Sequence, residues 1–248
     1  MNTFELRANN KLLKTKLLPS TWDELSFFQL KKILSKKMSS WQIFFVLLNL
    51  KWYQFRLLYL LRKIRKDDLW KIEHFADWVS ESERHIKKQF LPSFKIRFTK
   101  FKGKENFGSL NFWQFVQADT FSQKYIQTKD KAHLISFLNV LYSSKSKNPK
   151  KLLAKLNPLY ANIILLWFQG NKIKLVKRYK QVFPQDSEPN ENNYTNFGWV
   201  GIIKSLSVGL TDMKKVGEEP VHTALNYLNI EITHSKEREA EAKRQAKK

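Results

Sequence analysis

The segment from Pro158 to Pro184 constrains the fold more than any other part of the chain. A proline is well placed in the first turn of a helix and disfavours helical geometry in the residue before it, so these two prolines predict the limits of one long helix. Its first half, residues 159–168, is apolar almost all round, which is typical of a buried helix. Its second half keeps an apolar stripe flanked by lysine and arginine. We therefore expect a scaffold helix that runs from the core to a basic surface.

The amino-acid composition favours a mainly helical protein. The chain has 248 residues, enough for one large domain or two small ones, and 42% apolar residues allow a substantial core. Seven glycines and seven prolines are too few for a turn-rich all-β fold. The chain contains no cysteine, which excludes disulfide bonds, thiol catalysis and cysteine-bound metals and fits a reducing cytoplasm.

Capping residues precede most of the segments in which apolar residues have helical spacing. Ser20 or Thr21 caps a short turn, and Glu24 has the capping-box spacing from Thr21. The caps expected further along are Ser26, Ser39 or Ser40, and Asn111 or Ser109. Helices are predicted over residues 27–35, 41–48, 52–65, 67–79, 112–128, 132–142, 150–156 and 198–208, in a short turn that ends at Gly217, and from 221 onward.

Residues 94–99 give the clearest strand signal, because polar and apolar residues alternate there with period two. This alternation places three apolar side chains on one face: Phe94, Ile96 and Phe98. A single strand is not stable alone, and the best partner in the sequence is the alternating segment 3–7. We therefore expect a small two-stranded sheet formed by about 3–7 and 94–101.

The expected fold class is mainly α, a multi-helix single domain over residues 1–233 that includes this small two-stranded β element. From His234 onward the apolar periodicity ends and charged residues of both signs follow one another. That pattern favours a solvated, charged helical extension over 234–248. The extension buries nothing by itself, so it either frays or binds a partner.

A net charge of +23, from 45 basic and 22 acidic residues, favours polyanionic partners such as nucleic acid, anionic lipid or an acidic protein surface. A solvated lysine-rich surface encoded by an A·T-rich genome explains the same excess. Residues 94–104 interleave aromatic and basic side chains, a pattern found in single-strand binders. An amphipathic edge strand gives the same pattern and is the favoured interpretation. The candidate contacts to a polyanion or partner are Lys95, Arg97, Lys100, Lys172, Lys174, Lys177, Arg178 and Lys180.

No catalytic constellation is visible in the sequence. The five histidines are scattered and none forms a metal-binding pair with helical spacing. The glycine-containing segment 103–108 lacks the terminal Lys-Ser/Thr of a phosphate-binding loop. We therefore expect a non-enzymatic protein without a cofactor or a bound metal.

The strongest membrane candidate is the apolar stretch 41–61. Four polar residues interrupt it: Asn49, Lys51, Gln54 and Arg56. No run therefore reaches the ~18–20 apolar residues of a spanning helix. Residues 1–20 lack the apolar block of a secretory signal. We expect no membrane span.

Three segments share a pattern of helix caps and core residues with a known group of proteins. They are Leu18–Leu25 with Gln29, Phe112–Asp119 through Tyr125, Thr128, Asp130, Leu141 and Tyr142, and Phe197–Trp199 through Ile203 with Val216 and the charged C-terminus. Together they resemble proteins of tail-gene modules in phages and prophages of Bacteroidetes. The strong lysine excess of this chain departs from that group.

This resemblance implies a role in tail or virion assembly, including a chaperone-like one, in the host cytoplasm or the virion. The partners that it implies are other phage structural or tail proteins. It supplies no catalytic residues. Binding of nucleic acid, which the net charge favours, is the alternative function.

Overall fold

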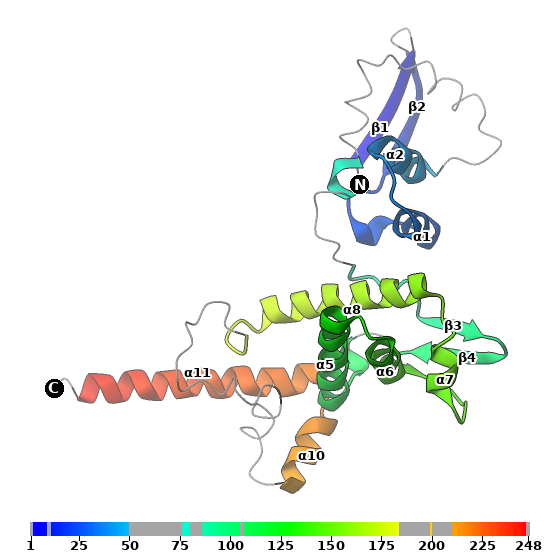
Figure 1. Cartoon of the computed structure of the whole chain (residues 1–248). Coiled ribbons are helices and arrows are strands. Elements are labelled where there is room, and N and C mark those ends of the chain that lie inside the picture. Colours follow the sequence, from blue (N-terminus) through cyan, green and yellow to red (C-terminus); the bar gives the residue numbers. More distant parts are fainter. Residues whose placement is uncertain are drawn as a thin grey trace. The chain divides into compact units, whose positions relative to one another are not determined.

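The computed structural model describes residues 2–8, 11–49, 76–79, 86–104, 107–183, 199 and 210–246 (Figure 1). These residues are mainly helical with small sheets, which confirms the expected fold class. Contacts divide the chain into two compact units, one formed by 1–90 with 166–170 and the other by 91–165 with 171–248. The domain bounds predicted from the sequence, 1–233 and 234–248, do not coincide with these units and stay a prediction.

The first unit begins with an antiparallel hairpin of β1 (Asn2–Ala8) and β2 (Lys11–Leu18). A 3-10 turn (Trp22–Glu24) and the helices α1 (Phe27–Ser35) and α2 (Ser40–Leu48) follow. The ring of Phe4 on β1 meets the ring of Phe44 on α2 edge-on, with centroids 5.4 Å apart. Because both rings are buried, this contact joins the hairpin to the helical part of the unit.

The caps of α1 and α2 lie among the residues predicted for them, with Ser39 chosen from the pair Ser39 or Ser40. Ser26 and Ser39 cap α1 and α2, and each forms a complete capping box with the glutamine three residues later. The buried Gln29 also donates two hydrogen bonds from Nε2, to the carbonyl oxygens of Val46 (3.1 Å) and Leu47 (2.9 Å) at the end of α2. One side chain therefore serves the start of α1 and the end of α2.

The predicted capping box of Thr21 and Glu24 is wrong. The Thr21 side chain makes no cap hydrogen bond. The Glu24 carboxylate instead accepts from the backbone N–H of Ser20 (2.7 Å) and from its hydroxyl (3.1 Å). The backbone hydrogen bond from Ser20 is the main cause that lowers the pKa of Glu24. The Glu24 side chain thus binds Ser20, one residue before the Thr21 that the capping-box spacing indicates.

The second unit contains a three-stranded antiparallel sheet in the order β3-β4-β5, formed by Ser93–Ile96, Thr99–Gly103 and Tyr142–Ser143. A 3-10 turn (Phe107–Ser109) lies between β4 and the next helix. The helices described in this unit are α5 (Phe112–Thr128), α6 (Lys131–Leu141), α7 (Pro149–Leu153), α8 (Pro158–Arg178), α10 (Leu210–Glu218) and α11 (Val221–Gln245). The aligned rings of Phe94 and Phe101 and the ring of Tyr142 cover the inner face of the sheet.

The predicted pairing of 3–7 with 94–101 is wrong. Strand β1 pairs with β2, with Ala8 opposite Lys11, and β3 pairs with β4, with Ile96 opposite Thr99. Both pairs are local hairpins, and a short connection costs less chain entropy than joining segments that lie far apart in sequence. Segment 11–18 carries three lysines and was not recognised as a strand.

The turn of the second hairpin also changes the predicted strand face. Phe94 and Ile96 are buried as expected, but Phe98 lies in the turn and is fully exposed. The chain reverses between Ile96 and Thr99, so Arg97 and Phe98 form the turn. The alternation of buried and exposed side chains therefore does not continue from β3 through these two residues. Arg97 has φ of 53°, in the left-handed region that glycine and asparagine favour.

The long helix is α8, which starts at Pro158 as predicted and ends at Arg178, before Pro184. It contributes 166–170 to the first unit and its remaining residues to the second. The predicted helices 52–65 and 198–208 lie outside the described residues, apart from Trp199, which is helical. The same holds for the predicted helix 67–79 except Ala76–Val79, which are helical.

A close backbone approach predicts the effect of substituting Gly170. A Cβ atom at this position of α8 would lie 2.8 Å from the carbonyl carbon of Ile86 and closer still to its oxygen. Replacing glycine by alanine inside a helix normally stabilises it by about 1 kcal/mol. We expect Gly170→Ala instead to lower the free energy of unfolding by about 1–3 kcal/mol, because rigid backbone must move.

Urea denaturation of the full chain measures this change. Asn162→Ala, at an exposed position of the same helix, is the matched control and is expected to stabilise slightly. A Gly170→Ala protein as stable as the Asn162→Ala protein would contradict the close packing of α8 against Ile86.

Candidate interaction surface

The outer face of the three-stranded sheet is polar and strongly basic. Buried residues on β3 and β4 alternate with exposed ones, so the lysines share the face opposite the aromatic core. We call the exposed set the basic sheet face, which consists of Ser93, Lys95, Lys100, Lys102 and Ser143. The inner aromatic rings hold it in place, as does the Tyr142 hydroxyl, which donates to the Leu91 carbonyl oxygen at 2.6 Å.

Two lysines of this face stand directly opposite each other. Lys95 on β3 is the register partner of Lys100 on β4. Like charges at such positions destabilise a sheet by a few tenths of a kcal/mol to about 1 kcal/mol. Among the described residues no carboxylate forms an ion pair with Lys95, Arg97 or Lys100. The local sequence offers none either, because residues 86–104 contain seven basic residues and no acidic one. The face therefore attracts anions.

A second basic surface lies at the end of α8. Lys174, Lys177 and Arg178 are exposed and have the three- and four-residue spacing of one helix face, and Lys180 follows in the turn. We call these four residues the basic ridge. Its support comes from Tyr179, whose hydroxyl hydrogen-bonds to Nδ1 of His222 on α11 at 3.1 Å.

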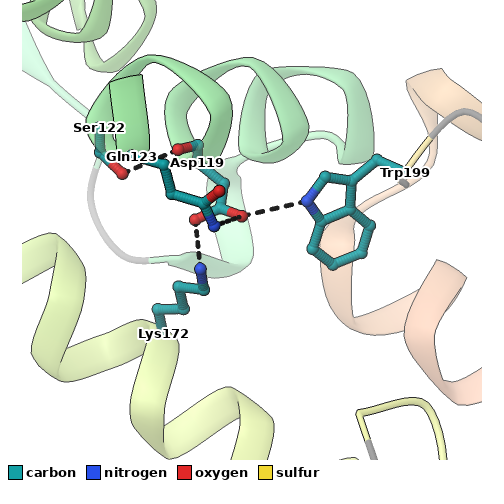
Figure 2. Close-up of polar contacts among 5 residues, drawn as sticks. All are labelled: Asp119, Ser122, Gln123, Lys172 and Trp199. Carbon is teal, nitrogen blue, oxygen red and sulfur yellow. Dashed lines mark hydrogen bonds and ion pairs between the residues drawn. The ribbon is translucent and has the colours of Figure 1, made fainter. Parts of the chain in front are cut away.

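Lys172 differs from the other candidate contact residues. Its ammonium lies 2.6 Å from Oδ1 of Asp119 on α5, so its charge is neutralised within the chain (Figure 2). The side chain of Asp119 is only 2% exposed, whereas that of Lys172 is 20% exposed. Lys172 therefore offers less charge to a partner than the exposed candidates, and its role as a contact stays a prediction.

The Asp119 carboxylate is the centre of a buried polar cluster (Figure 2). Besides Lys172, its Oδ2 accepts from Nε1 of Trp199 at 3.0 Å and from Nε2 of Gln123 at 3.1 Å. The hydroxyl of Ser122 donates to the Asp119 backbone oxygen at 2.9 Å. A buried carboxylate is tolerated only with such partners. The cluster therefore fixes α5, α8 and Trp199 relative to one another.

Trp199 also packs against three aromatic rings. Its ring meets those of Phe112, Phe115 and Phe183 edge-on, with centroids 5.3–5.8 Å apart. The cluster itself was missed, although an aspartate that continues the spacing of Phe112, Phe115 and Val116 on an apolar helix face was a usable signal.

His222 is half-buried where α11 meets α8. Burial is the main cause that lowers its pKa, and the positive charges of Arg178 and Lys174 lower the pKa further. The neutral imidazole is therefore favoured, in keeping with its hydrogen bond to Tyr179. Two residues of the basic ridge thus influence the protonation of a histidine at the contact between α8 and α11.

Helix α11 extends well beyond its packed part. Val221, Ala224, Leu225 and Leu228 are buried, and no residue from 229 to 246 is. Two large apolar side chains stand exposed three residues apart, Tyr227 at 58% and Ile230 at 51%. From His234 to Ala246 every residue is exposed. We call residues 229–246 the α11 arm.

Within the described ranges, no group of three or more histidine, aspartate and glutamate side chains is arranged to hold a metal ion. No helix in that part of the chain has the length and apolarity needed for a membrane crossing. His74 and His85 lie outside the described residues. Comparison with protein-family models, curated proteins and solved structures finds no match to the chain.

The buried cluster predicts a strong energetic coupling between Asp119 and Lys172. Asp119→Ala is expected to lower the free energy of unfolding by about 3 kcal/mol, because three donors lose their acceptor. Lys172→Met leaves a buried carboxylate without its cation and is also expected to destabilise.

Urea denaturation of both variants and of the double variant measures the coupling, expected to exceed about 1 kcal/mol. The control Lys177→Met should change stability by less than about 0.5 kcal/mol. Strictly additive costs would argue against the cluster.

The lowered pKa of His222 predicts a dependence of stability on pH. The unfolded chain binds the His222 proton more readily than the folded chain, since the unfolded pKa is about 6.5. The stabilisation is therefore fully present above about pH 6.5 and is lost as the pH falls towards the lower folded pKa. Thermal unfolding across this range should show a shallower pH dependence for His222→Gln than for the unsubstituted chain. His234→Gln, at an exposed position of the same helix, is the matched control, and equal slopes for the two variants would contradict the assignment.

Proposed function

We propose that this chain is a non-enzymatic interaction protein of phage tail or virion assembly that binds another tail protein in a chaperone-like manner, in the host cytoplasm or the virion. The resemblance of three sequence segments to tail-module proteins supports the biological setting. The observation that carries the proposal is the α11 arm, which continues a packed helix for roughly 25 Å without a buried residue.

A helix that buries no residue over this length needs a reason to be helical. Isolated helices of about 12–15 residues are marginal in water, and exposed ion pairs add only ~0.2–0.5 kcal/mol each. The arm therefore gains most of its stability when a partner packs on it. Tyr227 and Ile230, at the point where burial ends, supply the apolar contacts that such an interface requires.

The charge of the basic ridge indicates the kind of partner. Lys174, Lys177, Arg178 and Lys180 are exposed, and Arg178 also lies 5.6 Å from the centroid of the Tyr179 ring. The ridge adjoins α11, because the hydroxyl of Thr233 donates to Oε1 of Gln181 at 3.1 Å. An acidic partner surface would thus be steered towards the helix that it binds. The alternative function, nucleic-acid binding, draws its support from the basic sheet face instead.

Co-expression of the tagged full chain with the tail proteins encoded beside it, followed by a pull-down, tests this proposal. We expect one stable complex. The double variant Tyr227→Ser with Ile230→Ser should change the association rate little and raise the dissociation rate of the complex. The double variant Lys174→Glu with Lys177→Glu should mainly lower the association rate and weaken the salt dependence of that rate.

The matched control is Lys124→Glu with Lys131→Glu, which reverses two exposed charges on α5 and α6. This control should retain the complex. If none of the neighbouring tail proteins forms a stable complex with the chain, the assembly function is refuted. If a complex forms but the α11 and basic-ridge variants do not change it, the proposed interface is refuted.

A further inference from the structure

We infer that the basic sheet face and the tip of the β3–β4 hairpin form a binding site for single-stranded nucleic acid. In this site Phe98 stacks on one base, while Lys95 and Lys100 contact phosphates. The site lies on a different surface from the basic ridge and the α11 arm. It therefore does not depend on the proposed assembly function.

The charge of the face is the first argument. The sheet register places Lys95 and Lys100 opposite each other at exposed positions, and no carboxylate among the described residues forms an ion pair with either of them. Lys102 extends the row along β4, two residues or roughly 6.7 Å from Lys100. Phosphate groups would relieve this repulsion, and the release of counterions would favour their binding.

The exposed ring at the hairpin tip is the second argument. Phe98 has 103% of its reference surface exposed, and it follows Arg97, which is also exposed. The bases of a single strand present open faces for such a ring, whereas those of a duplex are already stacked on one another. An acidic side chain satisfies the lysines alone, whereas each nucleotide supplies both a phosphate for the lysines and a base for the ring. The combination thus favours single strands over duplexes and acidic proteins.

The rigidity of the hairpin is the third argument. The aligned rings of Phe94 and Phe101 lie 5.4 Å apart behind the lysines, and Phe94 also lies 4.8 Å from the ring of Tyr142. The backbone positions of the exposed row are thus fixed before any ligand binds, which reduces the entropy cost of binding. Substitution of the exposed residues should leave this core and the fold intact.

Fluorescence anisotropy of a labelled oligothymidine of about 16 nucleotides, titrated with the full chain from ~50 mM salt upward, tests the site. Lys95→Gln with Lys100→Gln should weaken binding and flatten the plot of log affinity against log salt by about 1.4, or ~0.7 for each lost phosphate contact. Phe98→Ala should weaken binding about 5- to 100-fold with little change in that slope.

Two comparisons make the experiment decisive. Lys124→Gln with Lys131→Gln removes the same charge from exposed positions on α5 and α6, and it should weaken binding much less than the double variant on the sheet. Unlabelled duplex of the same length and polyglutamate should both compete poorly against the labelled single strand.

Negligible binding at ~50 mM salt would overturn the inference, and so would equal weakening by the control and by the sheet variant. If duplex competes as well as single strand and Phe98→Ala does not change the affinity, binding is due to the general electrostatic field of the protein instead. Effective competition by polyglutamate would assign the face to an acidic polypeptide. Circular dichroism of each variant verifies that the fold is unchanged.

Discussion

The described part of the second unit is organised around the buried carboxylate of Asp119. Asp119 sits in the middle of α5, among aromatic side chains, where an unpaired charge would cost several kcal/mol. Lys172, Trp199 and Gln123 supply its donors from two other parts of the chain and from the next turn of its own helix. Because each donor must arrive in a defined direction, the cluster specifies how these elements are placed, which apolar packing alone does less strictly.

The Asp119 cluster also shows how one charge can be removed from a basic surface. Lys172, Lys174, Lys177 and Arg178 lie within two turns of α8, yet only Lys172 points its charge at an internal partner. The other three stay exposed, and two of them lower the pKa of His222 on the neighbouring helix. The same helix thus uses its lysines for internal pairing in one turn and for outward charge in the next.

The helices could be predicted from the sequence, because their signals are local. Ser26 was recognised as a cap, and Ser39 and Asn111 were each one of two candidates at their helix. All three form a capping box in the structure. Strand pairing was less accessible. The hairpin partner of β1 is a lysine-rich segment without clear alternation, and the two turn residues Arg97 and Phe98 resemble strand residues in sequence. Which surface lysines pair internally depends on contacts between distant segments, so the role of Lys172 could not be predicted.

The double use of Gln29 has a consequence for how the first unit opens. Its Oε1 accepts from the Ser26 backbone N–H at 2.8 Å, while its Nε2 donates to two carbonyl groups at the end of α2. Fraying of either helix end would break the hydrogen bonds that hold the other. The beginning of α1 and the close of α2 should therefore exchange their amide hydrogens as one cooperative element, although 17 and 18 residues separate Gln29 from Val46 and Leu47.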